Sequence, residues 1–273
     1  MKLVTWEGGF GRIEAEQVVP MGRDLVHYLA SGESSDGPPI EHGSISPLAP
    51  IPRPGKVIGI GLNYRDHAEE TGQPVPSEPI LFAKFANSVI GPGEPIVVPP
   101  ATTEPDYEAE LGVVIGHTAR DVDLDRALEH VAGYLCCNDV SARDLQMRVP
   151  QWMHGKAIDT FLPCGPWLVT ADEIPDPQAL RLRTWVNGDL RQDSSTSDLV
   201  FGPRELADFI GQTCTLHPGD LILTGTPSGV GMASGRFLSD GDVVRIEIEK
   251  LGVIEHEVSG ISSQASGTAE PLA

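Results

Sequence analysis

The sequence predicts an α+β fold in which short strands carry most of the structure. The 273 residues include 30 glycines and 24 prolines, a high share for a helical bundle but typical of strands joined by many turns. Hydrophobic residues make up 40% of the chain and charged residues 21%, near the averages of globular domains, so the chain can build a core. A chain of this length forms one large domain, or one large and one small domain.

We expect the chain to divide near residue 50. The first part contains a short alternating stretch and a brief helix in VPMGRDLVHYLASG. Four prolines between residues 47 and 54 favour extended backbone and mark a connector. We therefore predict a small N-terminal α+β domain with its connector at residues 1–50, a larger domain at 54–260 and a flexible tail at 261–273.

The larger domain is expected to be rich in strands. Apolar runs bounded by turn residues occur in KVIGIGLNY, PILFAKF, EPIVVPP, YEAELGVVIG, LRLRTWVNG, GDLILTGTP and GDVVRIEIEKLGVIEHEV. An Asn-Gly-Asp turn after LRLRTWV and a turn at Lys250–Gly252 predict two hairpins. Helices are expected in RDHAEETG, which ends at Gly72, in PRELADFIGQT, and in LDRALEHVAGYLCCND, whose apolar residues recur at helical spacing.

The charge balance excludes two classes of partner. Lysine and arginine number 19 against 39 acidic residues, which gives a formal net charge of -20. Nucleic-acid binding depends on basic side chains that neutralise phosphates, and anionic membrane surfaces attract basic segments. The acidic chain is therefore expected to bind neither.

Several features favour a cytoplasmic protein. The first residues, MKLVTWEGGFGR, contain no apolar signal segment, and no run of about 18 apolar residues occurs. The four cysteines form neither a metal-binding pair nor a disulfide framework. We expect them to be reduced thiols, mostly buried as small hydrophobic side chains.

The most informative segment is DYEAELGVVIG. Because side chains alternate along a strand, Asp106, Glu108 and Glu110 would share one face. A solvated edge strand would tolerate these acids, but they lead into an apolar run expected to be buried, where an unpartnered carboxylate is costly. Two carboxylates two residues apart can converge on one hard divalent cation, so this segment is a candidate metal site.

Asp139, in CCNDVSARDLQ, is a further candidate ligand. It could equally cap a helix that begins one or two residues later, which is a common use of aspartate. Asp139 alone therefore decides nothing.

His67 and Glu70 are a candidate general-base pair. They lie three residues apart in RDHAEETG and so share one face of a helix. A carboxylate beside an imidazole orients it and raises its basicity, which suits the deprotonation of water. A surface histidine near a glutamate has the same spacing. Glycine and prolines that follow could let the segment close as a lid.

Three cations and two glycine-rich motifs complete the candidates. Lys84, Arg143 and Lys156 lie in apolar or turn-rich segments; each could be a surface charge, but an anionic substrate would need such groups in so acidic a chain. GTPSGVG at 225–231 lacks the lysine of a phosphate-binding loop, and GIG at 59–61 lacks the third glycine of a dinucleotide fingerprint. Neither motif predicts a nucleotide.

Seven motifs together resemble the fumarylacetoacetate hydrolase family, in order and at matching spacing. They are IGIGLNYRDHAEE, ILFAKFANSVIGPGEPI, DYEAELGVVIG, CCNDVSARDLQ, GKAIDTFLPCGPW, VNGDLRQ and GDLILTGTPSGVG. The resemblance covers about residues 54–258, and the preceding part is similar to the small N-terminal domain of bacterial two-domain members. It implies a mixed β-sheet roll as catalytic domain, usually a homodimer, that binds Mg²⁺ or Mn²⁺ and acts on small anionic 2-oxo acids.

The family's functional residues transfer onto motif positions of this sequence. The resemblance implies Glu108, Glu110 and Asp139 as metal ligands, His67 and Glu70 as the lid dyad that activates water, Lys156 as the lysine near the metal, and Arg143, Gln146 and Thr226 as substrate contacts.

The leading functional hypothesis is a metal-dependent hydrolase that cleaves a carbon–carbon bond in an acylpyruvate-like or fumarylpyruvate-like diketo acid. An enolate held by a metal is common to hydrolysis, decarboxylation and proton transfer. Oxaloacetate decarboxylation and 2-hydroxyhepta-2,4-diene-1,7-dioate isomerisation therefore stay open as alternatives at the same site, and fold analogy does not choose among them. A non-catalytic, metal-stabilised binding protein is the alternative of another class.

Overall fold

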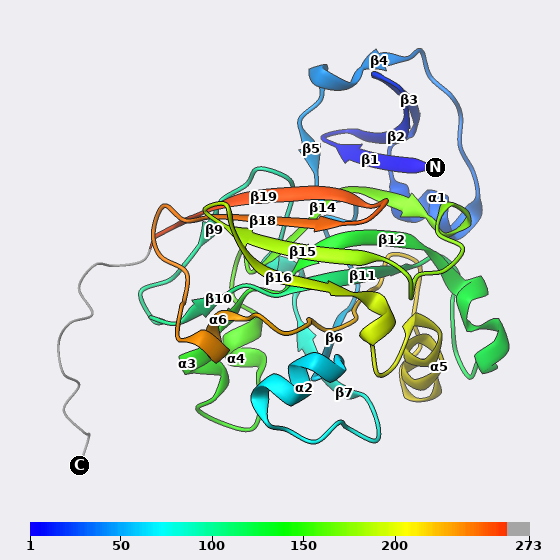
Figure 1. Cartoon of the computed structure of the whole chain (residues 1–273). Coiled ribbons are helices and arrows are strands. Elements are labelled where there is room, and N and C mark those ends of the chain that lie inside the picture. The colour runs from blue at the N-terminus through cyan, green and yellow to red at the C-terminus, as the bar shows by residue number, and fades with distance from the viewer. Residues whose placement is uncertain (261–273) are drawn as a thin grey trace.

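Two β-sheets pack face to face in the computed structural model, which describes residues 1–260 (Figure 1). The predicted tail at 261–273 lies outside the described residues. The large mixed sheet has the spatial order β4 (Ile40–Glu41), β3 (Gln17–Gly22), β2 (Gly9–Glu14), β1 (Lys2–Trp6), β14 (Leu162–Thr170), β12 (Val131–Asn138), β11 (Ala109–Ile115), β17 (Leu221–Leu223), β6 (Val57–Gly61) and β7 (Ile80–Lys84), with β5 (Pro47–Leu48) paired to β1 and β8 (Val89–Ile90) to β14.

The second sheet covers one face of the first. Its order is β16 (Asp189–Ser195), β15 (Arg181–Val186), β18 (Val243–Ile248), β19 (Gly252–Ser259) and β9 (Ile96–Val97), and a separate two-stranded ladder joins β10 (Pro105–Asp106) to β13 (Ser141–Ala142). The Asn-Gly turn between β15 and β16 has positive φ at both residues, +53° and +84°, as the predicted hairpin requires. The fold is therefore mixed α+β and dominated by strands, as the sequence predicts.

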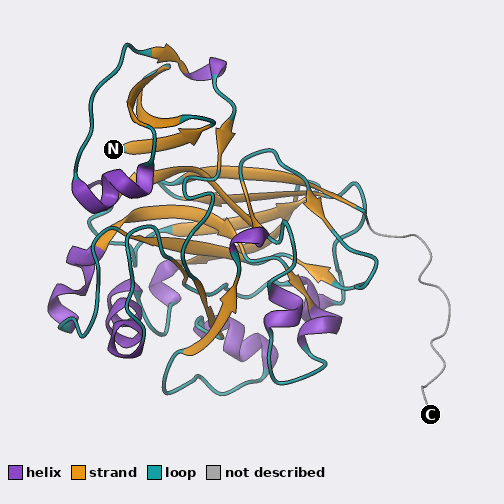
Figure 2. Ribbon diagram, turned by 180° about the vertical axis from the view of Figure 1, so that it is seen from behind, coloured by secondary structure: helices purple, strands orange, loops and turns teal. Residues whose placement is uncertain are grey.

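The helices are short and most of them lie below the sheets (Figure 2). They are α1 (Leu25–Ser31), α2 (Arg65–Thr71), α3 (Arg143–Gln146), α4 (Met153–Lys156), α5 (Pro203–Thr213) and α6 (Gly231–Ser234), with 3-10 turns at His42–Ser44, Ala86–Ser88, Leu124–His130, Ala171–Glu173 and Thr196–Asp198. The helices predicted in RDHAEETG and PRELADFIGQT are α2, which ends at Gly72, and α5. Within residues 1–260, none of the helices has both the length and the apolar character that a membrane span needs.

One predicted helix is wrong. The segment LDRALEHVAGYLCCND forms a 3-10 turn over Leu124–His130 and then the eight-residue strand β12. β12 lies between β11 and β14 and is buried on both faces, so nearly every residue in it is apolar. A continuous apolar run matches helical spacing as well as strand spacing, and pairing to two neighbouring strands decides the outcome.

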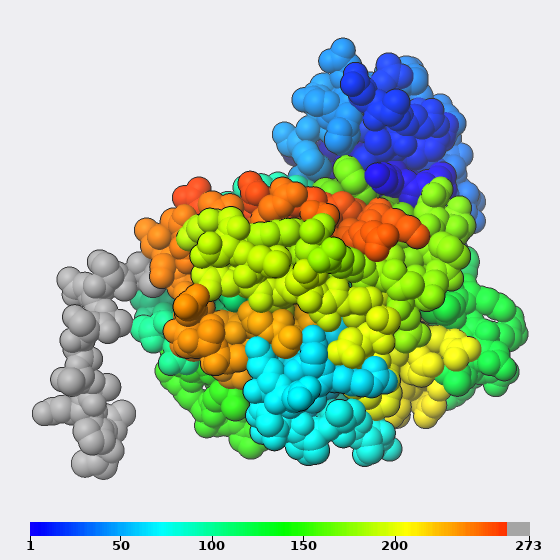
Figure 3. All heavy atoms as spheres, viewed as in Figure 1, coloured from blue at the N-terminus to red at the C-terminus, as the bar shows by residue number. Residues whose placement is uncertain are grey.

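The N-terminal segment extends the large sheet through the pairing of β1 with β14. Its atoms form a projection at one end of the molecule, drawn in blue in Figure 3. Leu3, Phe10 and Leu25 of this segment pack against Leu135 and Leu168 on the face of the sheet opposite the second sheet. The segment therefore packs on the face of the large sheet that also carries Cys137 and, opposite it in register, Glu110.

Lowering the pH is expected to destabilise the fold through His256. Its side chain on β19 is buried; Nδ1 donates to the Glu94 carbonyl at 2.8 Å, and Nε2 has no hydrogen-bond partner. Burial outweighs that hydrogen bond and lowers the pKa of His256. The folded state therefore binds the proton less tightly than the unfolded state, and stability is lost as the pH falls through the ordinary histidine range near 6.5.

Urea unfolding at pH 7.5 and 5.5 measures this effect. His256→Gln is expected to lose less free energy of unfolding between these pH values than the wild type does. His117→Gln, at an exposed position, serves as the matched control and should retain the wild-type pH dependence. Equal pH dependence in the two variants would show that His256 does not cause the loss.

Candidate functional site

Two neighbouring strands bring three carboxylates together. Glu108 directly precedes β11, Glu110 is its second residue, and Asp139 directly follows β12. The Asp139 N–H donates to the Glu108 carbonyl at 2.9 Å, and one oxygen of each of the three side chains lies within 4.8 Å of the others. All three are buried, so a solvated edge strand does not describe them. Asp139 caps no helix, because α3 begins at Arg143 after Ala142.

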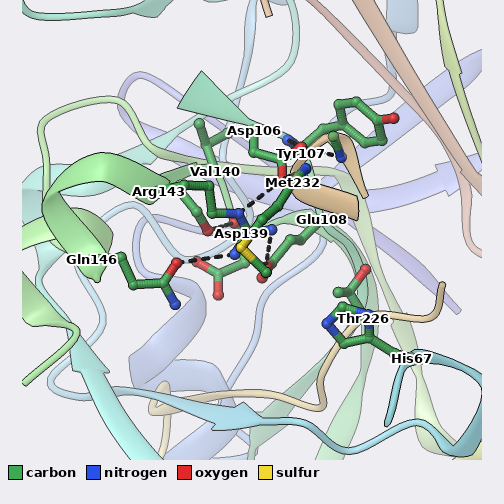
Figure 4. A network of polar contacts seen from close by, with 12 residues as sticks. His67, Asp106, Tyr107, Glu108, Asp139, Val140, Arg143, Gln146, Thr226 and Met232 are labelled. Atoms are coloured by element: carbon green, nitrogen blue, oxygen red, sulfur yellow. Dashed lines mark hydrogen bonds and ion pairs between the residues drawn. The ribbon is translucent and has the colours of Figure 1, made fainter. Parts of the chain in front are cut away.

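Three buried cations surround the carboxylate cluster. Lys156 Nζ lies 2.6 Å from both Glu108 Oε2 and Asp139 Oδ2. Lys84 Nζ is 2.7 Å from Asp139 Oδ1, and Arg143 Nη2 is 2.7 Å from Glu108 Oε1. Glu108 and Asp139 therefore each have cationic neighbours. Figure 4 shows Arg143 close to Asp106, Glu108 and Gln146.

The charges of the cluster are unequal. Burial opposes ionisation of Glu108, but Lys156 and Arg143 outweigh it and lower its pKa to about 2. Burial also opposes the charge of Lys156, yet Asp139 and Glu108 raise its pKa. Glu110 differs, because burial and the negative charges of Asp139 and Glu108 raise its pKa well above the usual value. Of the two glutamates, Glu110 is therefore the one whose ionised form is disfavoured by its surroundings.

This donor set fits a hard divalent cation. The three side chains supply carboxylate oxygens, the ligands that Mg²⁺ and Mn²⁺ prefer. Asp139 Oδ1 accepts no hydrogen bond despite its proximity to Lys84. The pKa of Glu110 is raised by burial and by repulsion from Asp139 and Glu108, and a bound cation would relieve that repulsion. Glu108, Glu110 and Asp139 are thus the residues that could hold a metal.

Helix α2 carries His67 and Glu70, the predicted general-base pair, and places His67 in the same cavity as Glu108 and Glu110. His67 Nδ1 lies 3.0 Å from Glu70 Oε2, and the other Glu70 oxygen accepts the Gly229 N–H at 2.8 Å. Because a carboxylate only accepts, Nδ1 carries the proton in this pair and Nε2 is left to take another. Before α2 the chain turns at Leu62, whose φ is +49°, and Asn63 fixes that turn by bonds to Phe201 and Thr224.

One cavity of about 380 Å³ collects these groups. Of the nine predicted site residues, those that line it are His67, Glu108, Glu110, Arg143, Gln146, Lys156 and Thr226. Asp139 and Glu70 lie behind this lining and contact Lys156 and His67, respectively. The structure therefore brings all nine residues into one site, either in the wall of the cavity or directly behind it.

A glycine-rich loop, residues 225–232, holds the site together through its backbone, whereas the sequence predicts a role only for its Thr226. Its backbone N–H groups donate to four carboxylates: Gly225 to Glu110 at 2.6 Å, Ser228 to Asp66 at 3.3 Å, Gly229 to Glu70 at 2.8 Å, and Gly231 and Met232 to Asp106 at 2.6 and 2.9 Å. Gly225 and Gly229 have φ of +96° and +99°, which other residues rarely adopt. The motif GTPSGVG is thus a cradle of N–H donors for carboxylates, not for phosphate.

Asp106 and Gln192 position two side chains that line the cavity, those of Arg143 and Thr226. Asp106 Oδ2 accepts from Arg143 Nε at 2.8 Å. Gln192 is buried; it donates to Thr226 Oγ1 at 2.9 Å and accepts the Ala109 N–H at 3.0 Å. Strand alternation places Asp106 on the same face as Glu108, which is a sequence signal that Asp106 belongs to the site. Gln192 ends the VNGDLRQ motif, but its role could not be assigned from the sequence, because its contacts join segments far apart in the chain.

Comparison with known protein families identifies the family of this chain. Residues 56–259 match the family model described as fumarylacetoacetate (FAA) hydrolase, C-terminal. The chain belongs to the fumarylacetoacetate hydrolase family. Relatives confirm this membership: the chain is 47% identical over 271 residues to the mitochondrial oxaloacetate tautomerase of Homo sapiens, a match that covers 94% of this chain and 86% of the relative.

Solved structures of the fumarylacetoacetate hydrolase family share the fold. The 5-carboxymethyl-2-hydroxymuconate delta-isomerase of Mycobacterium smegmatis matches with a TM-score of 0.84 and 37% identity, over 95% of this chain and 100% of that one. Maleylpyruvate hydrolase of Sphingobium sp. SYK-6, solved with manganese(II) and pyruvate, matches with a TM-score of 0.79 and 30% identity, over 96% and 100%. The prediction of an enzyme of this family is confirmed, and the non-catalytic interpretation is set aside.

Proposed function

We propose that this enzyme is a divalent-metal-dependent hydrolase that cleaves the bond between C3 and C4 of an acylpyruvate-like diketo acid. The supporting observation is that the His67–Glu70 dyad and the three-carboxylate cluster meet at one cavity. The manganese and pyruvate in the related maleylpyruvate hydrolase structure support a divalent cation and a pyruvyl unit as occupants. Mg²⁺ and Mn²⁺ are both proposed, since both prefer oxygen ligands.

Charge explains how an acidic protein would hold an anion here. Asp106, Glu108, Glu110 and Asp139 face Lys84, Arg143 and Lys156, which gives a formal charge of -1 when all are ionised. A divalent cation would change this to +1. The site would then attract the substrate carboxylate, although the whole chain carries -20.

The protein's own residues would move the protons. His67, oriented by Glu70, takes a proton from the water that attacks C4. When bound, the divalent cation would stabilise negative charge that develops on the 2-oxo oxygen. Arg143 and Gln146, which contact each other at 3.0 Å, would orient the C1 carboxylate, and Thr226 the distal carbonyl.

The atoms balance without a further reactant. Water adds its oxygen to C4, and the C3–C4 electron pair stays with the pyruvyl part. C3 then takes a proton, so the products are a carboxylate and pyruvate.

Tautomerisation or isomerisation of a 2-oxo acid is the second candidate. The relatives include an oxaloacetate tautomerase and a delta-isomerase, and His67 could carry a proton between carbon and oxygen without attack by water. Oxaloacetate decarboxylation would use the same carboxylate cluster.

A spectrophotometric screen tests the proposal. Acylpyruvates, fumarylpyruvate and oxaloacetate are each supplied with Mg²⁺ or Mn²⁺, and loss of the diketo absorbance is matched to pyruvate formed. Hydrolysis predicts one pyruvate per diketo acid consumed. Enol–keto exchange of oxaloacetate without any cleavage of an acylpyruvate would instead establish the second candidate.

We also propose that the enzyme is a homodimer. Large apolar side chains are exposed along one edge of the large sheet. Ile80, Leu81 and Phe85 lie on or directly after β7, the last strand of that sheet. Met147 and Val149 lie in the loop before α4, and Met153 lies on α4, which packs against β7. A monomer rarely exposes so many together. Light scattering is expected to give a mass twice the chain mass of 29.2 kDa. Leu81→Glu should lower the measured mass toward that of one chain. Leu190→Glu, at an exposed position on the β15–β16 hairpin, is the control and should leave the mass unchanged.

A further inference from the structure

The cavity has two ends of opposite character. The polar end contains the carboxylates, Arg143, Lys156 and His67, with Met232 beside them (Figure 4). The other apolar side chains that line the cavity are Ile60, Ile80, Phe82, Met147 and Trp152. The ring centroids of Phe82 and Trp152 are 5.8 Å apart, and Lys156 Nζ lies 4.9 Å from the centre of the Phe82 ring. The apolar wall therefore begins directly beside the polar end.

The backbone of β6 is shaped for these two rings. A Cβ atom added at Gly59 would lie 2.1 Å from the Phe82 ring, and one added at Gly61 would lie 2.2 Å from the Trp152 ring. Any side chain at either position would displace a ring. The glycines of GIG thus allow Phe82 and Trp152 to lie against the strand.

The cations of the cavity are committed to the polar end. Arg143 directs Nε to Asp106, Nη1 to Gln146 and Nη2 to Glu108, and Lys156 contacts two carboxylates. These are the lysine and arginine side chains among the described residues that line the cavity. A carboxylate at the apolar end would lose hydration without gaining a cationic partner, which is costly.

We propose that the Phe82–Trp152 end of the cavity binds an uncharged hydrocarbon acyl group, so that the enzyme prefers alkyl or aryl acylpyruvates to substrates with a second carboxylate at that end. This inference rests on the proposed function and narrows its substrate class. The cavity has room for such a group. At about 30 Å³ for each water-sized group, the six heavy atoms of a pyruvyl unit fill only part of 380 Å³.

Turnover of three diketo acids tests the preference. With Mg²⁺, kcat/KM is expected to be about tenfold or more higher for hexanoylpyruvate than for acetylpyruvate, because each buried methylene favours binding. Fumarylpyruvate should be at least about tenfold poorer than hexanoylpyruvate. A kcat/KM for fumarylpyruvate equal to or above that for hexanoylpyruvate would overturn the proposal.

Variants at Trp152 test whether the substrate preference arises at the Phe82–Trp152 end of the cavity. Trp152→Ala is expected to raise KM for hexanoylpyruvate about tenfold with little change for acetylpyruvate, whereas Trp152→Arg should improve relative use of fumarylpyruvate. Trp185→Ala is the matched control, since Trp185 lies on β15 between Arg183 and Arg245 and does not line the cavity. If Trp152→Ala affects both uncharged substrates equally, the apolar end does not bind the acyl group.

Equilibrium binding separates this inference from the proposed reaction. 2-Oxooctanoate and 2-oxoglutarate lack the distal ketone and are not cleaved; with Mg²⁺ present, 2-oxooctanoate is expected to bind about tenfold or more tightly in calorimetry. That preference without cleavage of any acylpyruvate would support the inference and refute the hydrolase. Cleavage of acylpyruvates with tighter binding of 2-oxoglutarate would support the hydrolase and refute the inference. Binding of neither acid, together with no cleavage of any acylpyruvate, would refute both.

Discussion

Replacing His67 by alanine is expected to lower kcat for an acylpyruvate by about 100-fold or more while leaving metal affinity nearly unchanged. A positioned general base contributes about 10²–10⁴-fold to such a reaction, and His67 contacts Glu70 but none of the three clustered carboxylates through a hydrogen bond. The measurement is steady-state turnover together with calorimetric titration of Mn²⁺ into the same preparation.

Two further variants make this result specific. Glu70→Gln keeps an acceptor for Nδ1 but removes the charge, so an intermediate loss of kcat is expected. His27→Ala removes a comparable histidine from α1, where His27 pairs with Glu33 on the surface, and should leave turnover unchanged. Unaltered kcat in His67→Ala would contradict the hydrolase mechanism, and a parallel loss of Mn²⁺ binding would assign His67 to the metal.

Replacing Glu110 by glutamine is expected to weaken metal binding by roughly 100-fold or more and to reduce turnover correspondingly, since even outer partners of metal ligands contribute 10–100-fold. The amide retains an oxygen for the Gly225 N–H and has nearly the same shape. Without metal, the variant should be at least as stable as the wild type, because it removes a carboxyl buried beside Glu108 and Asp139.

Thermal unfolding with and without Mn²⁺ distinguishes these two effects. The wild type should gain stability with rising Mn²⁺, as any ligand of the folded state requires, and Glu110→Gln should gain little. Glu69→Gln, on the exposed face of α2, removes the same charge outside the cluster and should respond like the wild type. A full Mn²⁺ response in Glu110→Gln would show that Glu110 is not a ligand.

The sequence predicts the local parts of this site well. Glu108 and Glu110 are two residues apart on a strand, and His67 and Glu70 three apart on a helix, so each pair is set by the period of its own element. The position of Asp139 could not be predicted from a local pattern, because its approach to Glu108 depends on the pairing of β11 with β12. The motifs of the family supplied that information, whereas the local pattern around Asp139 suggested a helix cap.

Other features could not be predicted, for physical reasons. The apolar run of β12 has no period of its own, since neighbours cover both faces. Lys84 reaches Asp139 and Gln192 reaches Thr226 from distant segments. The N–H donors of the loop at 225–232 belong to the backbone, so no side-chain type marks them. The Phe82–Trp152 wall depends on two glycines opposite it.

The loop at 225–232 offers a way to observe the site by spectroscopy. Each of its donating amides contacts one carboxylate: Gly225 reports on Glu110, Ser228 on Asp66, Gly229 on Glu70, and Gly231 with Met232 on Asp106. An amide proton shifts when the carboxylate that accepts it gains a proton or a cation, because the hydrogen bond to the charged form is the stronger one. Five resonances in one nitrogen-15 correlation spectrum would thus report separately on Glu110, Asp66, Glu70 and Asp106.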